Sequence, residues 1–249
     1  MPKIFVHGNP ETRAIWEDLF AELATRGIDD VIALEPPAFG APAPQGWGGT
    51  QSEYREWLVS ELAGIDGEID LVGHDWGAGH VFGVLSGAKV RVRTWAADCA
   101  GLMHPDYVWH DAAQAWQTPD IGESVVEAMT GSSPEEFSAM MSPLGMRDAI
   151  ARRVSAELND ETARCILSLY RSAAQPAMSE LGALFRNVAP IGGMVIIAEN
   201  DHFAGTRAMH EEVASWTGAT VAHLPGVGHW WMIEKPREAA DALCAHWGV

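Results

Sequence analysis

Basic residues and long apolar runs are scarce in this chain of 249 residues. Lysine and arginine number 16 against 34 aspartate and glutamate residues, which gives a formal charge of −18. This excess of negative charge disfavours nucleic acids and anionic membranes as partners. No apolar run is long enough to cross a bilayer. The first residues lack the charged, apolar and cleavage regions of a signal peptide, so we expect none.

Cysteine is also rare, and its placement limits the chemistry that sulfur can supply. Three residues are scattered along the chain: Cys99, Cys165 and Cys244. An odd, dispersed set argues against a disulfide framework and against a thiolate zinc site, and it fits a reducing cytoplasm. The histidines in the middle of the chain also lack the spacing of metal ligands, so we expect no metal site.

The pattern that is present is an alternation of short apolar runs with helical periodicity, which predicts a mostly parallel α/β sheet. The predicted strands are 4–6, 31–34, 69–72, 92–97, 193–198 and 220–224. The predicted helices are 12–26, 51–65, 76–86, 203–216 and 236–246. About eighty residues show helical patterns but no convincing strand. We therefore expect a core of residues 1–101 and 187–249 with a helical insertion at 102–186.

Three polar residues follow predicted strands, where open α/β sheets place their ligands. Asp75 lies in the sequence Gly-His-Asp-Trp-Gly, Asp201 follows an apolar run, and His229 lies in Gly-Val-Gly-His-Trp. Their chain order, with nucleophile first, acid second and histidine last, is that of the α/β-hydrolase fold. The serine expected in the first motif is replaced by a carboxylate.

With these motifs the chain resembles the α/β-hydrolases that use an aspartate nucleophile, the haloalkane dehalogenases and epoxide hydrolases. The matching stretches are His-Gly-Asn-Pro at 7–10, Val-Gly-His-Asp-Trp-Gly at 72–77, Glu-Asn-Asp at 199–201 and Gly-His-Trp at 228–230. The resemblance implies that 102–186 form a helical cap and that no cofactor is needed. These enzymes usually have two strands before the His-Gly motif. Here that motif comes at residue 7, so we expect about six strands rather than eight.

A carboxylate nucleophile suits attack on an alkyl carbon. Serine would form an ether there, which water does not readily cleave, whereas Asp75 forms an ester that an activated water can hydrolyse. His229 would be the general base of that second step, and Asp201 would orient its ring. Asp98, which follows strand 92–97, is a reserve candidate for the triad acid.

The departing group also needs stabilisation, and here the resemblance suggests two chemistries. For carbon–halogen hydrolysis it implies that Asn9 and Trp76 hold the halide. Their backbone N–H groups would also form the oxyanion hole for ester hydrolysis. For epoxide opening it implies that tyrosines of the cap protonate the alkoxide, and the candidates are Tyr170 and Tyr107.

Simpler roles exist for the same residues. Asn9 is a suitable helix cap, and Trp76 and Tyr170 could pack in a core.

The first hypothesis is a haloalkane dehalogenase-like hydrolase acting on a small apolar organic substrate. The alternative is an epoxide hydrolase giving a diol, and a third is a non-catalytic small-molecule binding protein. Nothing in the sequence specifies an oligomeric state.

Overall fold

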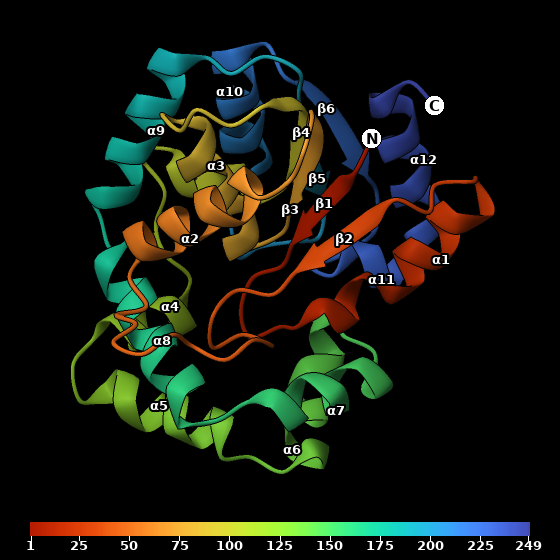
Figure 1. Ribbon diagram of the computed structural model, residues 1–249. Helices are drawn as coiled ribbons and strands as arrows, with labels where there is room; N and C mark the ends of the chain where they lie inside the picture. Colours follow the sequence, from red (N-terminus) through yellow and green to blue (C-terminus); the bar gives the residue numbers. More distant parts are fainter.

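A computed structural model describes all 249 residues. Its six strands form one parallel sheet in the order β2-β1-β3-β4-β5-β6 (Figure 1). The strands are β1 (Lys3–Val6), β2 (Val31–Leu34), β3 (Ile69–Gly73), β4 (Val92–Ala97), β5 (Gly193–Ala198) and β6 (Thr220–Leu224). The α/β-hydrolase architecture and the expected six strands are confirmed, and β2, β4, β5 and β6 have the predicted bounds.

Strand β1 shows why the central strands read as continuous apolar runs. Ile4 and Val6 pack into a cluster with residues of α2 (Gln51–Ala63) and α3 (Trp76–Leu85). Phe5 points to the other face, where its ring contacts Trp16 at a centroid distance of 5.1 Å. Both faces of the sheet are therefore covered, as is typical of parallel sheets.

The helices form two layers over this sheet (Figure 1). On one face lie α1 (Glu17–Thr25), α11 (Trp231–Glu234) and α12 (Pro236–Trp247), and on the other lie α2, α3, α9 (Ala177–Val188) and α10 (Arg207–Thr217). The predicted helix 203–216 begins later, at Arg207. Asp201 first binds the N–H of Phe203, Gly205 has a φ of 101°, and Thr206 then caps the helix.

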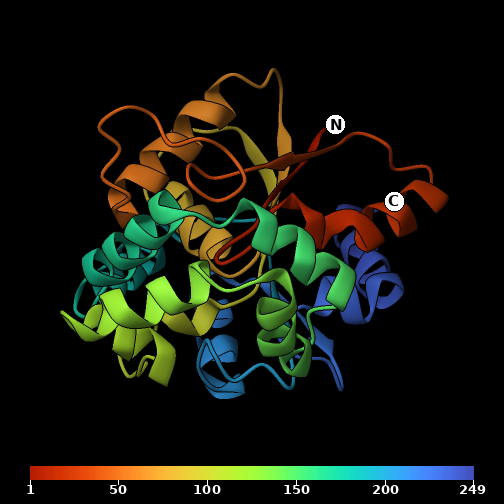
Figure 2. The same ribbon diagram turned by 90° about the horizontal axis from the view of Figure 1, so that it is seen from below.

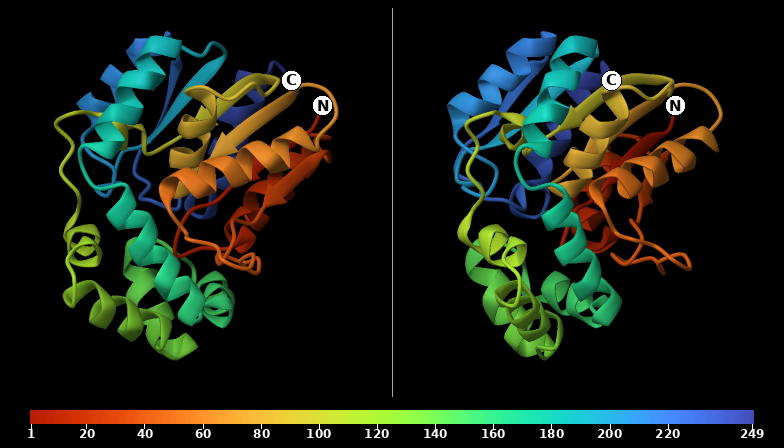
Figure 3. Two further views of the ribbon diagram at one scale, coloured as in Figure 1. Left: turned by 60° about the vertical axis from the view of Figure 1, so that its left-hand side comes forward. Right: turned by 90° about the vertical axis from the view of Figure 1, so that its left-hand side faces the viewer.

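Five helices form the cap, which lies across the carboxyl ends of the strands (Figures 2 and 3). They are α4 (Asp111–Gln117), α5 (Ile121–Thr130), α6 (Pro134–Met141), α7 (Asp148–Glu157) and α8 (Asp160–Ser172). As predicted, residues 102–186 contain no strand. The expected boundary after residue 186 falls inside α9, which packs against α3 and the 3₁₀ turn Ala100–Met103. None of the helices of the protein is both long and apolar enough to span a membrane.

Candidate active site

Asp75 lies in a sharp turn between β3 and α3. Its φ of 51° and ψ of −123° are rare for a residue with a side chain, and such angles often mark functional sites. Two glycines permit this turn. A Cβ on Gly8 would lie 2.1 Å from Asp75 Oδ2, and a Cβ on Gly77 would lie 2.0 Å from the Val6 carbonyl oxygen. The glycines of the motif thus let β1 and the turn approach each other, which presents the Asp75 carboxylate at the edge of the sheet.

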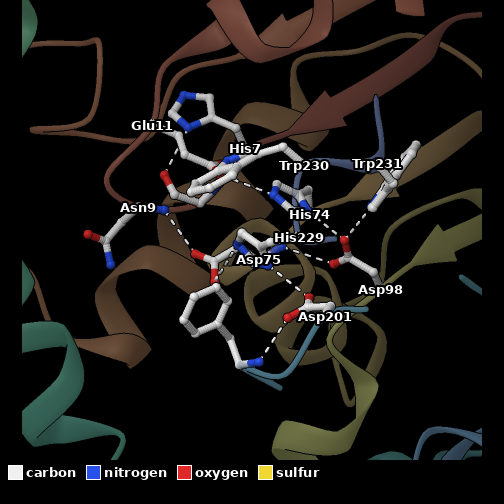
Figure 4. Close-up of polar contacts among 12 residues, drawn as sticks. His7, Asn9, Glu11, His74, Asp75, Asp98, Asp201, His229, Trp230 and Trp231 are labelled. Atoms are coloured by element: carbon white, nitrogen blue, oxygen red, sulfur yellow. Dashed lines mark hydrogen bonds and ion pairs between the residues drawn. The ribbon is translucent and has the colours of Figure 1, made fainter. Parts of the chain in front are cut away.

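The structure brings the three predicted catalytic residues together (Figure 4). His229 Nδ1 and Asp201 Oδ2 are hydrogen-bonded at 2.8 Å, and Asp201 Oδ1 accepts the N–H of Phe203 at 2.8 Å. His229 Nε2 faces Asp75 Oδ1 at 3.8 Å. That separation is too long for a hydrogen bond and suits a water bound between the two groups. Asp201 is therefore the carboxylate that pairs with His229, and the reserve candidate Asp98 does not contact His229.

The charges of these residues depend on one another. Burial raises the pKa of Asp75 to about 6, although the nearby His229 acts in the opposite direction. Burial by itself would lower the pKa of His229, but the carboxylate of Asp201 outweighs it and raises this pKa to about 9. Near neutral pH the resting site therefore holds an ionised Asp75 and a protonated His229.

One backbone N–H group contacts the other oxygen of the Asp75 carboxylate. The N–H of Asn9 donates to Asp75 Oδ2 at 2.9 Å. Trp76 is the first residue of α3, and the first N–H groups of a helix have no partner within it. These two donors lie where the oxyanion hole was expected.

The side chains of Asn9 and Trp76 lie in different environments. Asn9 lines a cavity between the core and the cap, and its side-chain oxygen and nitrogen are buried without a hydrogen-bond partner. Trp76 is only 1% exposed and does not line the cavity. Its ring packs against Trp109 and Tyr170 at centroid distances of 6.0 and 5.3 Å. Asn9 thus reaches the cavity directly, whereas the Trp76 side chain forms part of the packing around it.

The two candidate cap tyrosines also differ. Tyr170, on α8, lines the cavity, and its hydroxyl oxygen lies beside the indole N–H of Trp76, which leaves the hydroxyl hydrogen free to donate. Tyr107 does not line the cavity, and its hydroxyl donates to the carbonyl oxygen of Phe203 at 2.6 Å. Of the two tyrosines, Tyr170 is the one that the structure places at the cavity wall.

A second buried cluster of a histidine and two carboxylates lies behind Asp75, and the sequence reasoning did not identify it. His74 binds Glu11 through Nε2 at 3.0 Å and Asp98 through Nδ1. Asp98 Oδ1 also accepts the N–H of Asp75 at 3.0 Å, and Glu11 Oε2 accepts the N–H of Gly8 at 2.9 Å. The cluster therefore fixes the backbone on both sides of the oxyanion hole (Figure 4).

His74 and Glu11 are both charged near neutral pH. Burial would lower the pKa of His74, but Asp98 and Glu11 raise it well above its usual value. Burial would raise the pKa of Glu11, but the charge of His74 brings it down to about 2. The signal that could have revealed the cluster is topological. Glu11 follows β1, His74 follows β3 and Asp98 follows β4, and these strands are neighbours in the sheet.

Two groups of side chains come close enough to share a metal ion: Glu11 with His74 and His229, and Cys99 with Asp201 and His229. Both nitrogens of His74 are already bonded to carboxylates, which leaves no lone pair for a metal. Burial raises the pKa of Cys99 well above its usual value, so this sulfur stays a thiol, and a thiolate is what binds metals. The side chains of these two groups are therefore arranged as members of a hydrogen-bonded network and not as a set of metal ligands.

A cavity of about 520 Å³ lies between the triad and the cap. Its wall includes Asp75 and His229 from the core and three methionines, Met129, Met140 and Met141, from the cap. No lysine or arginine lines it. Of the tryptophans, Trp116 and Trp230 reach the cavity. The site can therefore hold a small, mostly apolar molecule against an ionised aspartate.

The fold is shared with several solved enzymes of low sequence identity. A point mutant of haloalkane dehalogenase DatA from Agrobacterium tumefaciens is 18% identical, with a TM-score of 0.78 over 100% of this chain and 90% of that one. A loop variant of haloalkane dehalogenase DbeA from Bradyrhizobium elkanii is also 18% identical, with a TM-score of 0.72 over 99% and 90% of the two chains. A malate-bound thermophilic esterase from Thermogutta terrifontis is 17% identical, with a TM-score of 0.70 over 99% and 89%.

These likenesses extend over the whole chain and show a common fold among enzymes whose names give different activities. A search of curated proteins finds no match. The sequence model of the alpha/beta hydrolase family matches residues 4–242, which include β1, the turn at Asp75, the helices between β4 and β5, and His229. The protein therefore belongs to the alpha/beta hydrolase family.

Proposed function

We propose that the protein hydrolyses a carbon–halogen bond through a covalent ester between Asp75 and an alkyl carbon. The observation that carries this proposal is the setting of the Asp75 carboxylate. One oxygen accepts the N–H of Asn9 at 2.9 Å, and the other faces His229 Nε2 at 3.8 Å. The residue at the nucleophile turn is a carboxylate, so the bond that it forms with an alkyl carbon is one that water can cleave.

In the first step an oxygen of Asp75 attacks the alkyl carbon. The carbon–halogen bond breaks, and its electron pair leaves with the halide. Because the nucleophile must be ionised, this step requires a pH above the Asp75 pKa of about 6. The ester that forms no longer carries the negative charge of Asp75.

In the second step His229 Nε2 takes a proton from water, and the water oxygen adds to the ester carbonyl carbon. The N–H groups of Asn9 and Trp76 stabilise the resulting oxyanion. The bond between that carbon and the alkyl oxygen then breaks, and the alcohol leaves with the proton from His229. The Asp75 charge helps to raise the pKa of His229. Esterification removes that charge, so His229 gives up its proton more readily in the intermediate.

The choice of halide as leaving group is supported by Asn9. Its buried amide lines the cavity beside the nucleophile and has no partner within the protein. A buried polar group without a partner is costly, and a departing halide would accept the amide N–H. Such a donor commonly contributes about 10²–10³ in rate.

Epoxide opening is the second candidate, and Tyr170 favours it. Its hydroxyl lines the same cavity, and both burial and the charge of Asp75 raise its pKa well above the usual value. A protonated hydroxyl at that place could give its proton to the alkoxide of an opening epoxide. The ester at Asp75 would then yield a vicinal diol. A non-catalytic binding protein would not require the assembled triad.

The experiment is to trap the ester. We expect a His229→Gln variant to form the intermediate and not to release it. It is incubated with 1-bromohexane and, separately, with styrene oxide, and the intact protein is weighed. A stable adduct with bromohexane alone supports the dehalogenase proposal, and one with styrene oxide alone assigns epoxide opening. The double variant with Asp75→Asn is the control and should gain no mass. Absence of both adducts, together with no turnover by the wild type, contradicts both candidates.

A further inference from the structure

The cap contributes three hydrogen-bond donors to the cavity wall that the protein itself does not use. His110 immediately precedes α4, Trp116 lies on α4 and Tyr170 lies on α8. Their rings are neighbours, since the Trp116 centroid is 6.1 Å from His110 and 4.7 Å from Tyr170. They form one group, which we call the cap donors.

The role of His110 as a helix cap fixes the position of its proton. Nδ1 accepts the N–H of Ala113 at 3.3 Å. An accepting Nδ1 needs its lone pair, so the neutral ring carries its hydrogen on Nε2. Burial lowers the pKa of His110 to about 4, which keeps the ring neutral at pH 7. Nε2 makes no hydrogen bond within the protein, so its N–H is free to meet a ligand in the cavity.

The position of His110 places this donor on the side of the cavity that His229 faces. Phe203 lies between the two histidines, with centroid distances of 5.1 Å to His110 and 5.2 Å to His229, and all three line the cavity. A molecule held against Asp75 and His229 therefore extends past Phe203 toward the cap donors.

The other two cap donors also lack an acceptor within the protein. The indole nitrogen of Trp116 is buried and lacks a partner, and the hydroxyl of Tyr170, which lies beside the Trp76 indole, donates to no group of the protein. A buried donor is usually paired, so Trp116 together with the free Nε2 of His110 points to an acceptor supplied by a ligand.

The charge of the cavity restricts what that acceptor can be. No lysine or arginine lines the wall, and the ionised Asp75 repels a second negative charge. A carboxylate or phosphate on the substrate would find no cation there except His229, whose charge is already offset by Asp201 and Asp75. A neutral oxygen, such as that of an ether, a carbonyl or an epoxide, can accept from an imidazole, an indole or a phenol without a counter-ion.

We propose that His110 donates its Nε2 hydrogen to a neutral oxygen of the substrate, with Trp116 and Tyr170 as neighbouring donors. The substrate is then an oxygen-bearing alkyl electrophile rather than a plain hydrocarbon halide. This assignment rests on the proposed function for the end of the molecule that reacts with Asp75. The donor role of His110 can be measured separately through binding.

The test uses a His110→Asn variant. Asparagine is a good helix cap through its side-chain oxygen, so it preserves the start of α4, and its shorter side chain withdraws the donor from the position of His110 Nε2. Turnover is compared for 1-bromohexane and 1-bromo-4-methoxybutane, which has the same shape and carries an ether oxygen. Binding of hexanamide, which has a carbonyl oxygen but no reactive bond, is followed by tryptophan fluorescence. His223→Asn, on an exposed position of β6, is the matched control.

We expect His110→Asn to lower kcat/KM for the ether about tenfold more than it lowers kcat/KM for bromohexane, a difference of about 1.4 kcal/mol. The Kd for hexanamide should rise about tenfold, and Tyr170→Phe should also weaken hexanamide binding. Equal losses on both bromides would show a structural role and overturn the proposal.

If the wild type turns over neither bromide, the proposed function fails, and the binding of hexanamide alone decides the role of His110. An unchanged Kd, or no binding by the wild type, then overturns it.

Discussion

Two buried histidines lie side by side behind the cavity, with ring centroids 4.6 Å apart, yet their surroundings give them different properties. His74 has a carboxylate on each nitrogen, Glu11 on one side and Asp98 on the other. His229 has one carboxylate, Asp201, and its second nitrogen faces Asp75 across 3.8 Å. Both nitrogens of His74 are hydrogen-bonded, whereas Nε2 of His229 has no hydrogen-bond partner.

This difference suits His74 to a structural role and His229 to proton transfer. A histidine with two ionised partners holds its proton firmly and acts as a fixed positive charge. A histidine with one partner and one free nitrogen can exchange a proton with water. His74, which precedes Asp75 in the sequence, therefore has no nitrogen free to act as a base. His229, which follows β6 and lines the cavity, has one, and this supports the role that we propose for it.

The largest expected effect is on turnover. His229→Gln removes the base, and we expect steady-state turnover to fall by about 10⁴ or more, as for loss of a member of a catalytic triad. The free energy of unfolding should fall less than for His74→Gln, because His229 has one hydrogen-bonded carboxylate where His74 has two. A variant with near-normal turnover would show that His229 is not the base.

The second effect should appear in stability. His74→Gln removes a buried positive charge and leaves Glu11 and Asp98 unpaired. We expect the free energy of unfolding to fall by about 3–5 kcal/mol, measured by urea denaturation at pH 7. The matched variant is His229→Gln. If both variants lose equal stability, the contrast between the two histidines is wrong.

The third prediction separates the two chemical steps. Asn9→Ala removes the side-chain amide and keeps the backbone N–H that binds Asp75. We expect a loss of about 10²–10³ in the rate of ester formation from a bromoalkane, measured by rapid quench. Ester hydrolysis should change much less, because it depends on backbone donors and His229. Unchanged ester formation would remove the argument for halide binding.

The smallest effect is on pH dependence. The proton on His229 is held more tightly than usual, with a pKa of about 9 in the resting enzyme, so its neutral fraction grows as pH rises. Asp75 is ionised above about pH 6. Between pH 6 and pH 9 we therefore expect ester hydrolysis to accelerate more than ester formation does. Mass spectrometry of acid-quenched enzyme should find more ester at pH 6.5 than at pH 9, and the reverse trend would contradict His229 as base.

The strands could be predicted from sequence because a buried parallel strand is an apolar run with few other interpretations. The order of Asp75, Asp201 and His229 along these strands then placed the triad. The cluster around His74 could not be predicted in this way, since a glutamate such as Glu11 is usually exposed, and its burial depends on a partner from another strand.

The cap was harder to interpret for a related reason. Helical periodicity shows that helices form, but it does not show which side chain reaches the cavity. Tyr107 and Tyr170 are equivalent as residue types. The carbonyl of Phe203, distant in sequence, binds the hydroxyl of Tyr107 and thereby keeps it from the substrate. His110 was overlooked because its donor becomes evident only when the helix that it caps is known.

The most direct test of the central claim is a single turnover in water labelled with oxygen-18, with enzyme in excess over 1-bromohexane. If Asp75 forms an ester and water attacks its carbonyl carbon, the alcohol carries the unlabelled oxygen of Asp75. The label is then found in the peptide that contains Asp75. Label in the alcohol, with none in that peptide, would mean that water attacks the substrate directly and would contradict the covalent mechanism.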